Sequence, residues 1–384
     1  MKIGAIIGEY NPFHNGHKYH IERTRAAGVT HIVSVMSGAF VQRGDVSLYD
    51  KHVRARTALE NGVDLVIELP VRYSLMSAEG FARGAVGIIS ALGCVDVLSF
   101  GSESGDMEAL KEASRAVEFT ARTEEFDRLI KRGRSYPAAL HEAMLEYYTE
   151  DVAELIASPN NTLAVEYLGA LDDIASAIVP MTVKRLGAEH DGDEEGVFMS
   201  ASAIRKKILG GGDCSAFAPA VDAPTADISR LERAILAKLR TLRAEDFERC
   251  YDSICGLSDR LYKAARGARS LSELYFLAKT KRFTLAGIRR AALCAFLGID
   301  KKFASEKPAY LRVLGMNARG REILAAAKCP VPIDTSLKAL SKTSREAFLQ
   351  ANLEARCTDI YSLAFAEPRA CGADFTAAPV IINE

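Results

Sequence analysis

The sequence predicts an α/β protein with a doubly wound, Rossmann-like parallel sheet in its first half, followed by a mainly helical C-terminal domain. Two observations support this prediction. Short apolar runs alternate with amphipathic stretches through the first 210 residues, as expected for buried parallel strands that are connected by helices. A stretch rich in glycine and proline follows, and the patterns after it are almost all helical.

The strands and helices follow from these patterns in order. The expected strands are the short apolar runs KIGAIIG, HIVSVMS, VDLVIELP, VDVLSFG and AIVPMTVKR, which begin at residues 2, 31, 63, 95 and 177. Amphipathic periodicity predicts helices at 16–27, 49–61, 77–92, 106–120 and about 160–175. Three consecutive glycines and two prolines mark the linker. We therefore expect a sheet domain at 1–210, a linker at 211–229 and a helical domain at 230–384.

The composition excludes some classes of protein. The 384 residues are 48% hydrophobic and 26% charged, which is typical of a globular protein with two domains. The net charge is −1, so any nucleic-acid surface must be local. No run reaches the roughly 20 apolar residues of a membrane span, and the N-terminus is unlike a signal peptide. The eight cysteines are scattered without a CxxC pair, so we expect reduced thiols in a cytoplasmic protein.

The segment EYNPFHNGH, from Glu9 to His17, follows the first expected strand and opens a helix. Pro12 cannot continue the strand, and Gly16 lets a ligand approach the backbone. His14 and His17 are three residues apart, so they share one face of the helix N-terminus, where free N–H groups and the helix dipole attract anions. The segment therefore suits a polyphosphate. No third ligand for zinc lies nearby, so we expect no metal site here.

A second motif, SASAIR, runs from Ser200 to Arg205. The serine predicts a helix cap, and the Arg205 guanidinium can donate two hydrogen bonds to a phosphate. Together with the histidine motif, it resembles the HxGH nucleotidyltransferase superfamily, whose members activate substrates with ATP.

Longer segments resemble one family in that superfamily, the bacterial tRNA(Met) cytidine acetate ligases. The resemblance covers nearly the whole chain, although Ala39 stands where asparagine is expected and the helical region matches more loosely. The segments that carry it are, in order, GEYNPFHNGHKYH, MSGAFVQRGDVSLYDK, GVDLVIELPV, SAEGFARGAV, FGSESGD, PNNTLAVEYL, VKRLGAEHDG, KTKRF and APVI.

The resemblance implies an ATP site at the carboxyl edge of the sheet. His14, His17 and Arg205 would be the catalytic residues, with the histidines holding phosphate. The implied ATP-binding residues are Ile7, Gly8, Glu9, Tyr10, Asn11, Pro12, Phe13, His14, Asn15, Gly16, His17, Lys18, Tyr19, His20, Gly101, Asn160, Asn161 (either asparagine), Arg185, Ser200 and Arg205.

The resemblance also implies a two-step reaction. Acetate attacks the α-phosphate of ATP, which gives acetyl adenylate and pyrophosphate. The exocyclic amine of the wobble cytidine of elongator tRNA(Met) then takes the acetyl group and AMP leaves. Such chemistry needs positioning and charge stabilisation, and the chain has neither a P-loop nor a G-x-S-x-G nucleophile motif. We expect Mg²⁺ on the phosphates, and an imidazolium that stabilises the phosphate charge by about 3–4 kcal/mol.

A basic stretch between residues 260 and 290 is the expected RNA surface. It holds nine basic residues and a single acidic one in a chain of net charge −1, and Tyr262, Tyr275 and Phe283 are interleaved to stack on bases. Two residues that follow the second strand are expected to guide the acceptor nucleotide. The expected tRNA-binding residues are Arg43, Lys51, Arg260, Lys263, Lys279, Lys281, Arg282, Arg289 and Arg290.

Two alternatives stay open. A small-molecule adenylyltransferase of the same superfamily would leave the basic helical half unexplained. A non-catalytic RNA-binding protein would have no chemical need for His14, Gly16, His17 and Arg205 together. No membrane contact and no protein partner is expected.

Overall fold

The sheet is built around β1 (Ile3–Gly8), which pairs in parallel with β2 (His31–Ser37) and with β6 (Val97–Ser102). Two more parallel strands extend it, β5 (Leu65–Leu69) beside β2 and β7 (Val179–Lys184) beside β6. All five strands expected from the sequence are therefore confirmed. The structure is a computed structural model, and it describes residues 1–186, 198–250, 256–304 and 307–383.

The strand order places a ligand site between β1 and β6. The order across the sheet is β10-β8-β5-β2-β1-β6-β7, with β9 beside β8. The chain moves from β1 toward β5 on one side and then returns to β6 and β7 on the other. Ligands of open α/β sheets bind beyond the carboxyl ends of the strands at such a reversal.

Helices cover both faces of the sheet, because residues that are adjacent in a strand point to opposite faces. Val33 and Ile67 join the core beneath α4 and α9, whereas Ile32 and Val66 pack with α1 and α2 on the other face. The sequence predicted these helices to within two residues at either end. Their bounds are α1 Asn15–Ala26, α2 Lys51–Glu60, α4 Ala78–Leu92, α5 Met107–Thr120 and α9 Pro159–Asp173.

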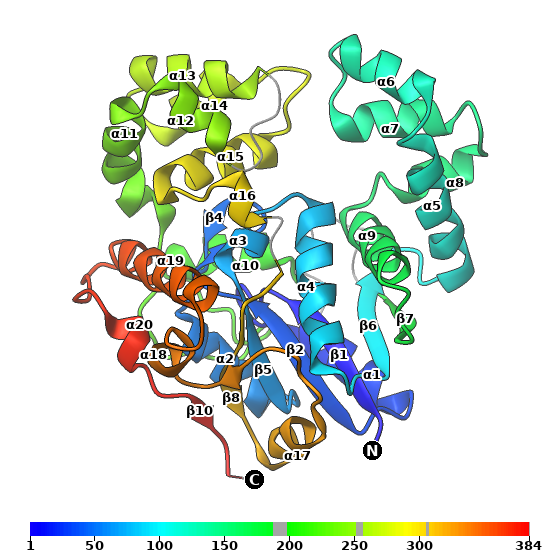
Figure 1. Cartoon of the computed structure of the whole chain (residues 1–384), viewed down its shortest axis with the longest axis vertical. Helices are drawn as coiled ribbons and strands as arrows, with labels where there is room; N and C mark the ends of the chain where they lie inside the picture. Colours follow the sequence, from blue (N-terminus) through cyan, green and yellow to red (C-terminus); the bar gives the residue numbers. More distant parts are fainter. Residues whose placement is uncertain (187–197, 251–255, 305–306, 384) are drawn as a thin grey trace.

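The expected strict alternation of strand and helix is wrong between β6 and β7. Three short helices follow α5 there and join α9 without an intervening strand: α6 (Glu124–Lys131), α7 (Tyr136–Met144) and α8 (Glu150–Leu155). They bury Phe126 and Leu140 in the same core as α4 and α9. In Figure 1 this group stands on one side, beyond the carboxyl ends of the parallel strands.

A second helical group stands on the other side in Figure 1 and has its own apolar core. Its main helices are α11 (Glu232–Thr241), α12 (Ala244–Arg249), α13 (Leu257–Gly267), α14 (Leu271–Ala278) and α15 (Leu285–Leu297). The other helices that the structure describes before residue 306 are α3 (Val71–Ser74), α10 (Ala201–Leu209), the 3-10 helix η1 (Ile228–Leu231) and α16 (Lys301–Ala304).

The part of the chain after residue 306 is mainly helical, as expected, but it also returns to the sheet of the first domain. Strand β8 (Leu311–Met316) pairs antiparallel with β5, and β10 (Val380–Ile381) pairs with β8. Arg312 hides this strand in the sequence, because a charged residue is not expected in a run that is buried throughout. The other elements are α17 (Ala318–Ala326), β9 (Ile333–Asp334), α18 (Leu337–Leu340), α19 (Arg345–Ser362) and α20 (Ala373–Thr376).

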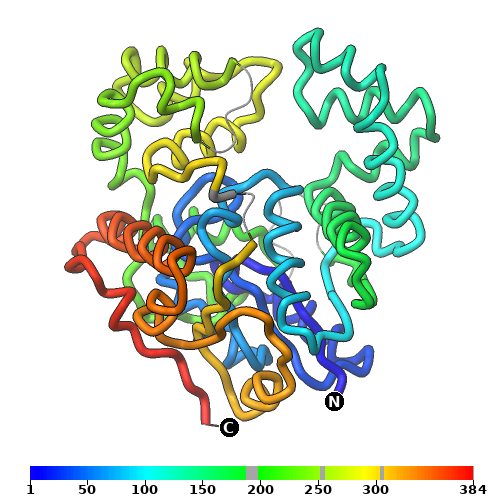
Figure 2. The backbone as a smooth tube through the Cα atoms, in the orientation of Figure 1, coloured from blue at the N-terminus to red at the C-terminus, as the bar shows by residue number. Residues whose placement is uncertain are grey.

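The expected linker 211–229 packs against the sheet domain. The Asn15 N–H donates to the Phe217 carbonyl over 2.8 Å, and the Ala226 N–H donates to the Leu48 carbonyl over 2.8 Å. Both chain termini lie at the end of the molecule away from the two helical groups (Figure 2).

The cysteines and helices of the described ranges are unexceptional. Seven cysteines are free, and Cys255 lies outside the described residues. None of the helices in these ranges has the length and apolar character needed to cross a bilayer.

Candidate active site

A cavity of about 700 Å³ lies at the carboxyl ends of β1 and β6. Loops after three strands, the start of α10 and a two-stranded hairpin contribute to it. Its polar lining includes Glu9, Asn11, His14, His17, His20, Gln42, Arg43, Asp45, Asn160, Lys184, Arg185, Ser200, Ser202 and Arg205.

The two histidines of the first loop cap helix α1 with their own rings. The Gly16 N–H donates to His14 Nδ1 over 3.1 Å, and the His14 N–H donates to His17 Nδ1 over 3.2 Å. These bonds form a capping box, a role more often filled by serine and glutamate. The rings stack with their centroids 3.8 Å apart. The backbone of the helix start therefore fixes both ring orientations.

The same bonds determine where each ring carries its proton. A backbone N–H can donate to Nδ1 only if that nitrogen is unprotonated, so the proton of the neutral ring is on Nε2. Burial lowers the pKa of His14 to about 4, and burial together with His14 lowers the pKa of His17 well below its ordinary value. Both rings are therefore neutral Nε2–H donors rather than the expected imidazolium.

Tyr10 holds the loop that carries these histidines. Its backbone has a φ of 45°, a left-handed conformation that is uncommon for a side chain of this size. The buried ring packs edge-on against the His17 ring with centroids 5.0 Å apart, and the Ser34 hydroxyl donates to the Tyr10 hydroxyl. Burial in the protein thus compensates for the backbone strain at this position.

The carboxyl ends of β6 and β7 bring a positive charge, that of Arg185, to the site. Arg185 follows β7, lowers the pKa of the three cavity histidines by its charge, and donates to Asn160 Oδ1 over 3.3 Å. Gly101 packs beside Arg185, since a Cβ there would lie 3.4 Å from Arg185 Cγ, an ordinary contact distance. Glu103 accepts hydrogen bonds from the N–H groups of Asn160 and Asn161 and so fixes the start of α9.

The sequence left open which of two asparagines contacts the nucleotide. Asn160 lines the cavity, whereas Asn161 is buried behind it and accepts hydrogen bonds from the backbone of Glu103 and Ser104. Among the described residues, Asn160 is therefore the member of this pair that a ligand in the cavity can reach.

Helix α10 brings Ser200 and Arg205 to the same cavity. The Ser200 hydroxyl accepts from the Ala203 N–H, as expected of a cap. Arg205 Nη1 donates to the Asn11 carbonyl over 2.7 Å and Nη2 donates to the Ser202 hydroxyl over 3.2 Å. Arg205 therefore joins α10 to the first loop, and part of its hydrogen-bonding capacity is used inside the protein.

The structure brings most of the expected nucleotide-binding residues to one cavity. Lining residues from the expected set are Ile7, Gly8, Glu9, Tyr10, Asn11, His14, Gly16, His17, Tyr19, His20, Gly101, Asn160, Arg185, Ser200 and Arg205. Pro12, Phe13, Asn15, Lys18 and Asn161 belong to the same segments but do not line it. Gln42 and Asp45 also line the cavity and were not predicted from the sequence, because two-residue strands leave no periodic pattern.

The whole chain matches known proteins. Residues 1–373 match the family model described as HIGH Nucleotidyl Transferase. A protein of Fervidobacterium nodosum called tRNA(Met) cytidine acetate ligase is 38% identical over 90% of this chain and 87% of its own length. The chain belongs to the tRNA(Met) cytidine acetate ligase family.

Other members of the family support this assignment. The ligase of Thermoanaerobacter sp. is 36% identical over 98% of both chains. The crystal structure of Thermotoga maritima TmcAL bound with α-thio ATP is 32% identical to this chain, covers 100% of both chains and superimposes with a TM-score of 0.89. The expected family and fold class are thus confirmed, including the helical group after the linker.

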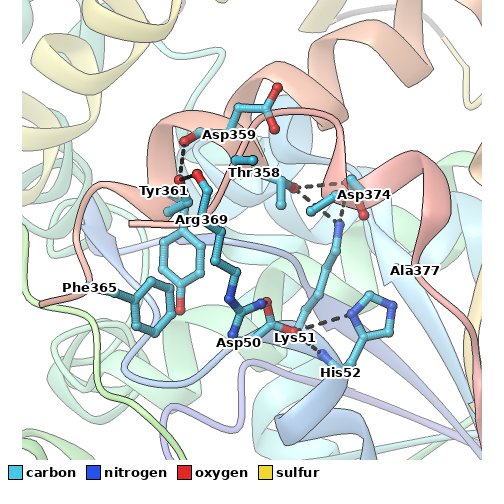
Figure 3. A pocket seen from close by; sticks show the side chains of 13 residues that line it. Asp50, Lys51, His52, Thr358, Asp359, Tyr361, Phe365, Arg369, Asp374 and Ala377 are labelled. Carbon is cyan, nitrogen blue, oxygen red and sulfur yellow. Dashed lines mark hydrogen bonds and ion pairs between the residues drawn. The ribbon is translucent and has the colours of Figure 1, made fainter. Parts of the chain in front are cut away.

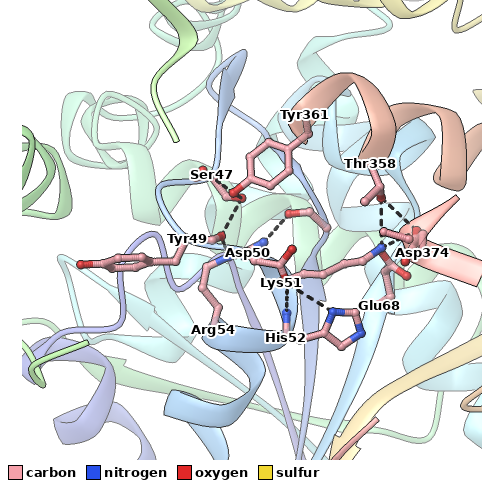
Figure 4. A network of polar contacts seen from close by, with 12 residues as sticks. Ser47, Tyr49, Asp50, Lys51, His52, Arg54, Glu68, Thr358, Tyr361 and Asp374 are labelled. Carbon is pink, nitrogen blue, oxygen red and sulfur yellow. Dashed lines mark hydrogen bonds and ion pairs between the residues drawn. The ribbon is translucent and has the colours of Figure 1, made fainter. Parts of the chain in front are cut away.

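The sequence predicted that Lys51 guides the acceptor nucleotide, and the structure contradicts this prediction. Its side chain is 2% exposed, and its ammonium contacts Glu68 over 2.7 Å and Asp374 over 2.8 Å. Arg312 pairs with the same two carboxylates over 3.1 and 2.7 Å. We call these four residues the buried ion cluster; Figure 4 shows Lys51 between its two carboxylate partners. Lys51 therefore has a structural role.

The buried ion cluster borders a second, smaller cavity of about 50 Å³ (Figure 3). Asp50, Arg369 and Thr358 also line it. Burial alone would lower the pKa of Lys51, but Asp374 and Glu68 outweigh this effect and raise it. This cavity lies between α2 on one side and α19 and α20 on the other, and it is separate from the cavity at the histidines.

The basic residues between 260 and 290 differ in their exposure to solvent. Lys263, Lys279 and Lys281 are exposed, although the Lys279 ammonium donates to the Phe283 carbonyl over 2.6 Å. Arg43 is exposed beside the cavity, and Arg260, Arg282 and Arg289 are half-buried. Arg290 is buried, and so are Tyr275 and Phe283, so the expected stacking by these two rings is wrong. Both rings pack into the core of the helical group. Phe276, which the sequence analysis passed over, is 80% exposed.

Proposed function

We propose that this protein acetylates the wobble cytidine of elongator tRNA(Met), using ATP and acetate. The observation that carries this proposal is the match to Thermotoga maritima TmcAL, because it spans both chains completely and that protein's structure holds an ATP analogue. The cavity between β1 and β6 supports the proposal, since its size and position suit a nucleotide. ATP would enter as its magnesium complex, the usual form in phosphoryl chemistry.

The first step needs positioning and charge stabilisation rather than a protein nucleophile. An acetate oxygen attacks the α-phosphorus, a new P–O bond forms, and pyrophosphate leaves with the electrons of the bond that breaks. His14 and His17 present Nε2–H donors at the N-terminus of α1, whose dipole also favours anions. Arg185 adds a positive charge beside them. These groups stabilise the negative charge that grows on the phosphates.

The magnesium of this proposal is the ion that ATP brings with it. Among the described residues, no cluster of three or more His, Cys, Asp or Glu side chains could hold a metal ion. Phosphate oxygens and water would supply most of the ligands of that magnesium ion.

The exposed basic residues of the helical group form the proposed tRNA face. Lys263 lies on α13, and Lys279, Lys281 and Arg282 follow α14, the helix that carries the exposed ring of Phe276. Positive charge beside an exposed aromatic ring is the usual arrangement for binding single-stranded RNA. We expect the anticodon loop to bind here because its bases are unpaired.

The decisive assay is acetate-dependent exchange of labelled pyrophosphate into ATP by the purified protein. Exchange that requires acetate, followed by acetylcytidine formation when tRNA(Met) is added, is the expected result. Exchange with a phosphorylated small molecule in place of acetate would support an adenylyltransferase of the same superfamily. Absence of ATP turnover with and without tRNA, in a protein that binds tRNA, would support the non-catalytic alternative.

The tRNA face has a matched test. Lys279→Glu with Lys281→Glu reverses two charges on the face, and Lys338→Glu with Lys342→Glu reverses two exposed charges elsewhere. We expect the first pair to weaken tRNA binding and to reduce the slope of log K against log salt by about 1.5, since each lost phosphate contact removes about 0.7–0.9. Equal effects of the two pairs would disprove a localised face.

A further inference from the structure

The hairpin of β3 (Phe40–Val41) and β4 (Asp45–Val46) connects the cavity to the basic helical group. On the cavity side, the Gln42 N–H donates to Glu9 Oε1 over 2.7 Å, which attaches the hairpin to the loop after β1. Val41, Gln42, Arg43 and Asp45 all line the cavity. The hairpin is therefore part of the wall of the nucleotide site.

On its other side the hairpin turn presses against α15. Gly44 has a φ of 75°, and a Cβ there would lie 2.6 Å from Arg289 Cβ and 2.7 Å from the Arg290 nitrogen. Arg290 also donates to the Gln42 carbonyl over 3.4 Å. Only glycine permits this contact. A nucleobase of an RNA that is bound to the basic helical group therefore reaches the acetyl adenylate beside this hairpin.

At this position, one of the two carboxylate oxygens of Asp45 accepts no hydrogen bond from the described part of the chain. Oδ1 accepts from the Val46 N–H over 2.8 Å, whereas Oδ2 accepts no hydrogen bond from any residue that the structure describes. The charges of Arg205 and Arg289 act to lower the pKa of Asp45 and that of Asp227 acts to raise it, and none of these three residues forms an ion pair with Asp45. Burial raises the pKa of Asp45, which makes its carboxylate a stronger base.

The second step of the proposed reaction needs such a base. The cytidine N4 nitrogen forms a bond to the acetyl carbon, the bond from that carbon to the phosphate oxygen breaks, and AMP leaves with its electrons. N4 must also lose a proton. His14 and His17 cannot take it in their observed state, because Nδ1 of each ring accepts a backbone N–H and Nε2 carries the proton. Glu9, like Asp45, has one oxygen bonded to a backbone N–H, but it lies in the loop after β1, whereas Asp45 lies on the hairpin that contacts α15.

We propose that Asp45 accepts the N4 proton and that the β3–β4 hairpin holds the acceptor cytosine next to the acetyl adenylate. This inference rests on the proposed function and deepens it, since it assigns the base of the transfer step and the place of the acceptor. The carboxylate would then release its proton to solvent after AMP departs.

The test separates the two steps of the reaction in Asp45→Asn, which keeps the shape of the side chain. We expect acetate-dependent pyrophosphate exchange within about threefold of wild type and unchanged tRNA affinity, with single-turnover acetyl transfer slower by about 100- to 10,000-fold. Asp45→Glu retains a carboxylate and should recover part of the transfer rate. Glu112→Gln, an exposed residue of α5, is the control for the loss of one negative charge.

Two results would overturn the inference. One is acetyl transfer at the wild-type rate in Asp45→Asn. The other is an equal loss of exchange and transfer in Asp45→Asn that Asp45→Glu restores equally, because that pattern belongs to a residue that shapes the nucleotide site. Failure of the proposed function looks different, since wild-type protein itself would then show no acetate-dependent exchange.

Discussion

Lys51→Met tests the buried ion cluster, because it removes one of two cations that face two buried carboxylates. The wild-type cluster is balanced, with Lys51 and Arg312 opposite Glu68 and Asp374. All four side chains are at most 2% exposed, so water cannot screen the negative charge that the substitution leaves behind. Breaking a buried pair in this way costs about 3–5 kcal/mol.

That cost is a large part of the stability of an ordinary protein, which is about 5–15 kcal/mol. At about 2–4 °C per kcal/mol for domains of comparable size, we expect the melting temperature to fall by roughly 6–20 °C. The protein should still fold in the cold, where pyrophosphate exchange and tRNA affinity should stay close to wild type. Thermal unfolding followed by circular dichroism, with exchange and tRNA binding measured on the same samples, provides the test.

A second substitution tests whether the balance of charge in the buried ion cluster determines stability. Lys51→Met combined with Asp374→Asn removes one charge of each sign, so the double variant should be more stable than Lys51→Met alone. A melting temperature unchanged by Lys51→Met, together with weaker tRNA binding, would refute the structural role and restore the RNA role expected from the sequence.

Three further predictions concern other sites. His17→Ala removes a Nε2–H donor and the acceptor for the His14 N–H, so exchange should fall by about 100- to 1,000-fold with tRNA binding intact; near-normal exchange in a folded variant would exclude this role. Burial and the nearby Glu68 raise the pKa of Glu354 from 4.5 to about 8, so this group stabilises the fold below pH 4.5 and the contribution is lost as the pH rises to 8. Glu354→Gln should therefore raise the melting temperature more at about pH 9 than at about pH 5, and equal shifts at both pH values would contradict a neutral Glu354. Phe276→Ala should weaken tRNA binding by about 1–3 kcal/mol without loss of stability, whereas Phe348→Ala, also exposed but on α19, should not; equal binding by both variants would remove Phe276 from the tRNA face.

The nucleotide site could be predicted largely from the sequence, because its residues follow strands of a recognisable pattern. The run Ile3–Gly8 reads as a buried strand, and a motif that begins a helix directly after it must lie at the carboxyl edge of the sheet. The protonation of the histidines could not be predicted. It depends on hydrogen bonds between ring nitrogens and backbone N–H groups, and these are set by ring orientation.

The errors about Lys51, Tyr275 and Phe276 share a physical cause, since the burial of a charged or aromatic side chain depends on parts of the fold that lie outside its own segment. Lys51 and Arg312 look like surface residues in the sequence, because the carboxylates that neutralise them come from other elements. Tyr275 and Phe276 are neighbours, yet one is buried and the other is exposed, and only the exact rotation of α14 decides which. Asp45 has no sequence signal, since its role comes from a turn that packs on α15.

The pairing of β8 with β5 has a consequence for how the protein folds during its synthesis. Arg312 comes 244 residues after Glu68, its partner in the buried ion cluster. At a synthesis rate of about 5–20 residues per second, β5 waits roughly 12–49 s for the strand that covers its edge. Throughout that time the nascent chain presents an apolar, unpaired strand and a carboxylate that lacks one of its two cations. An edge of this kind is open to pairing with other chains, so we expect the nascent protein to depend on chaperones until β8 has left the ribosome.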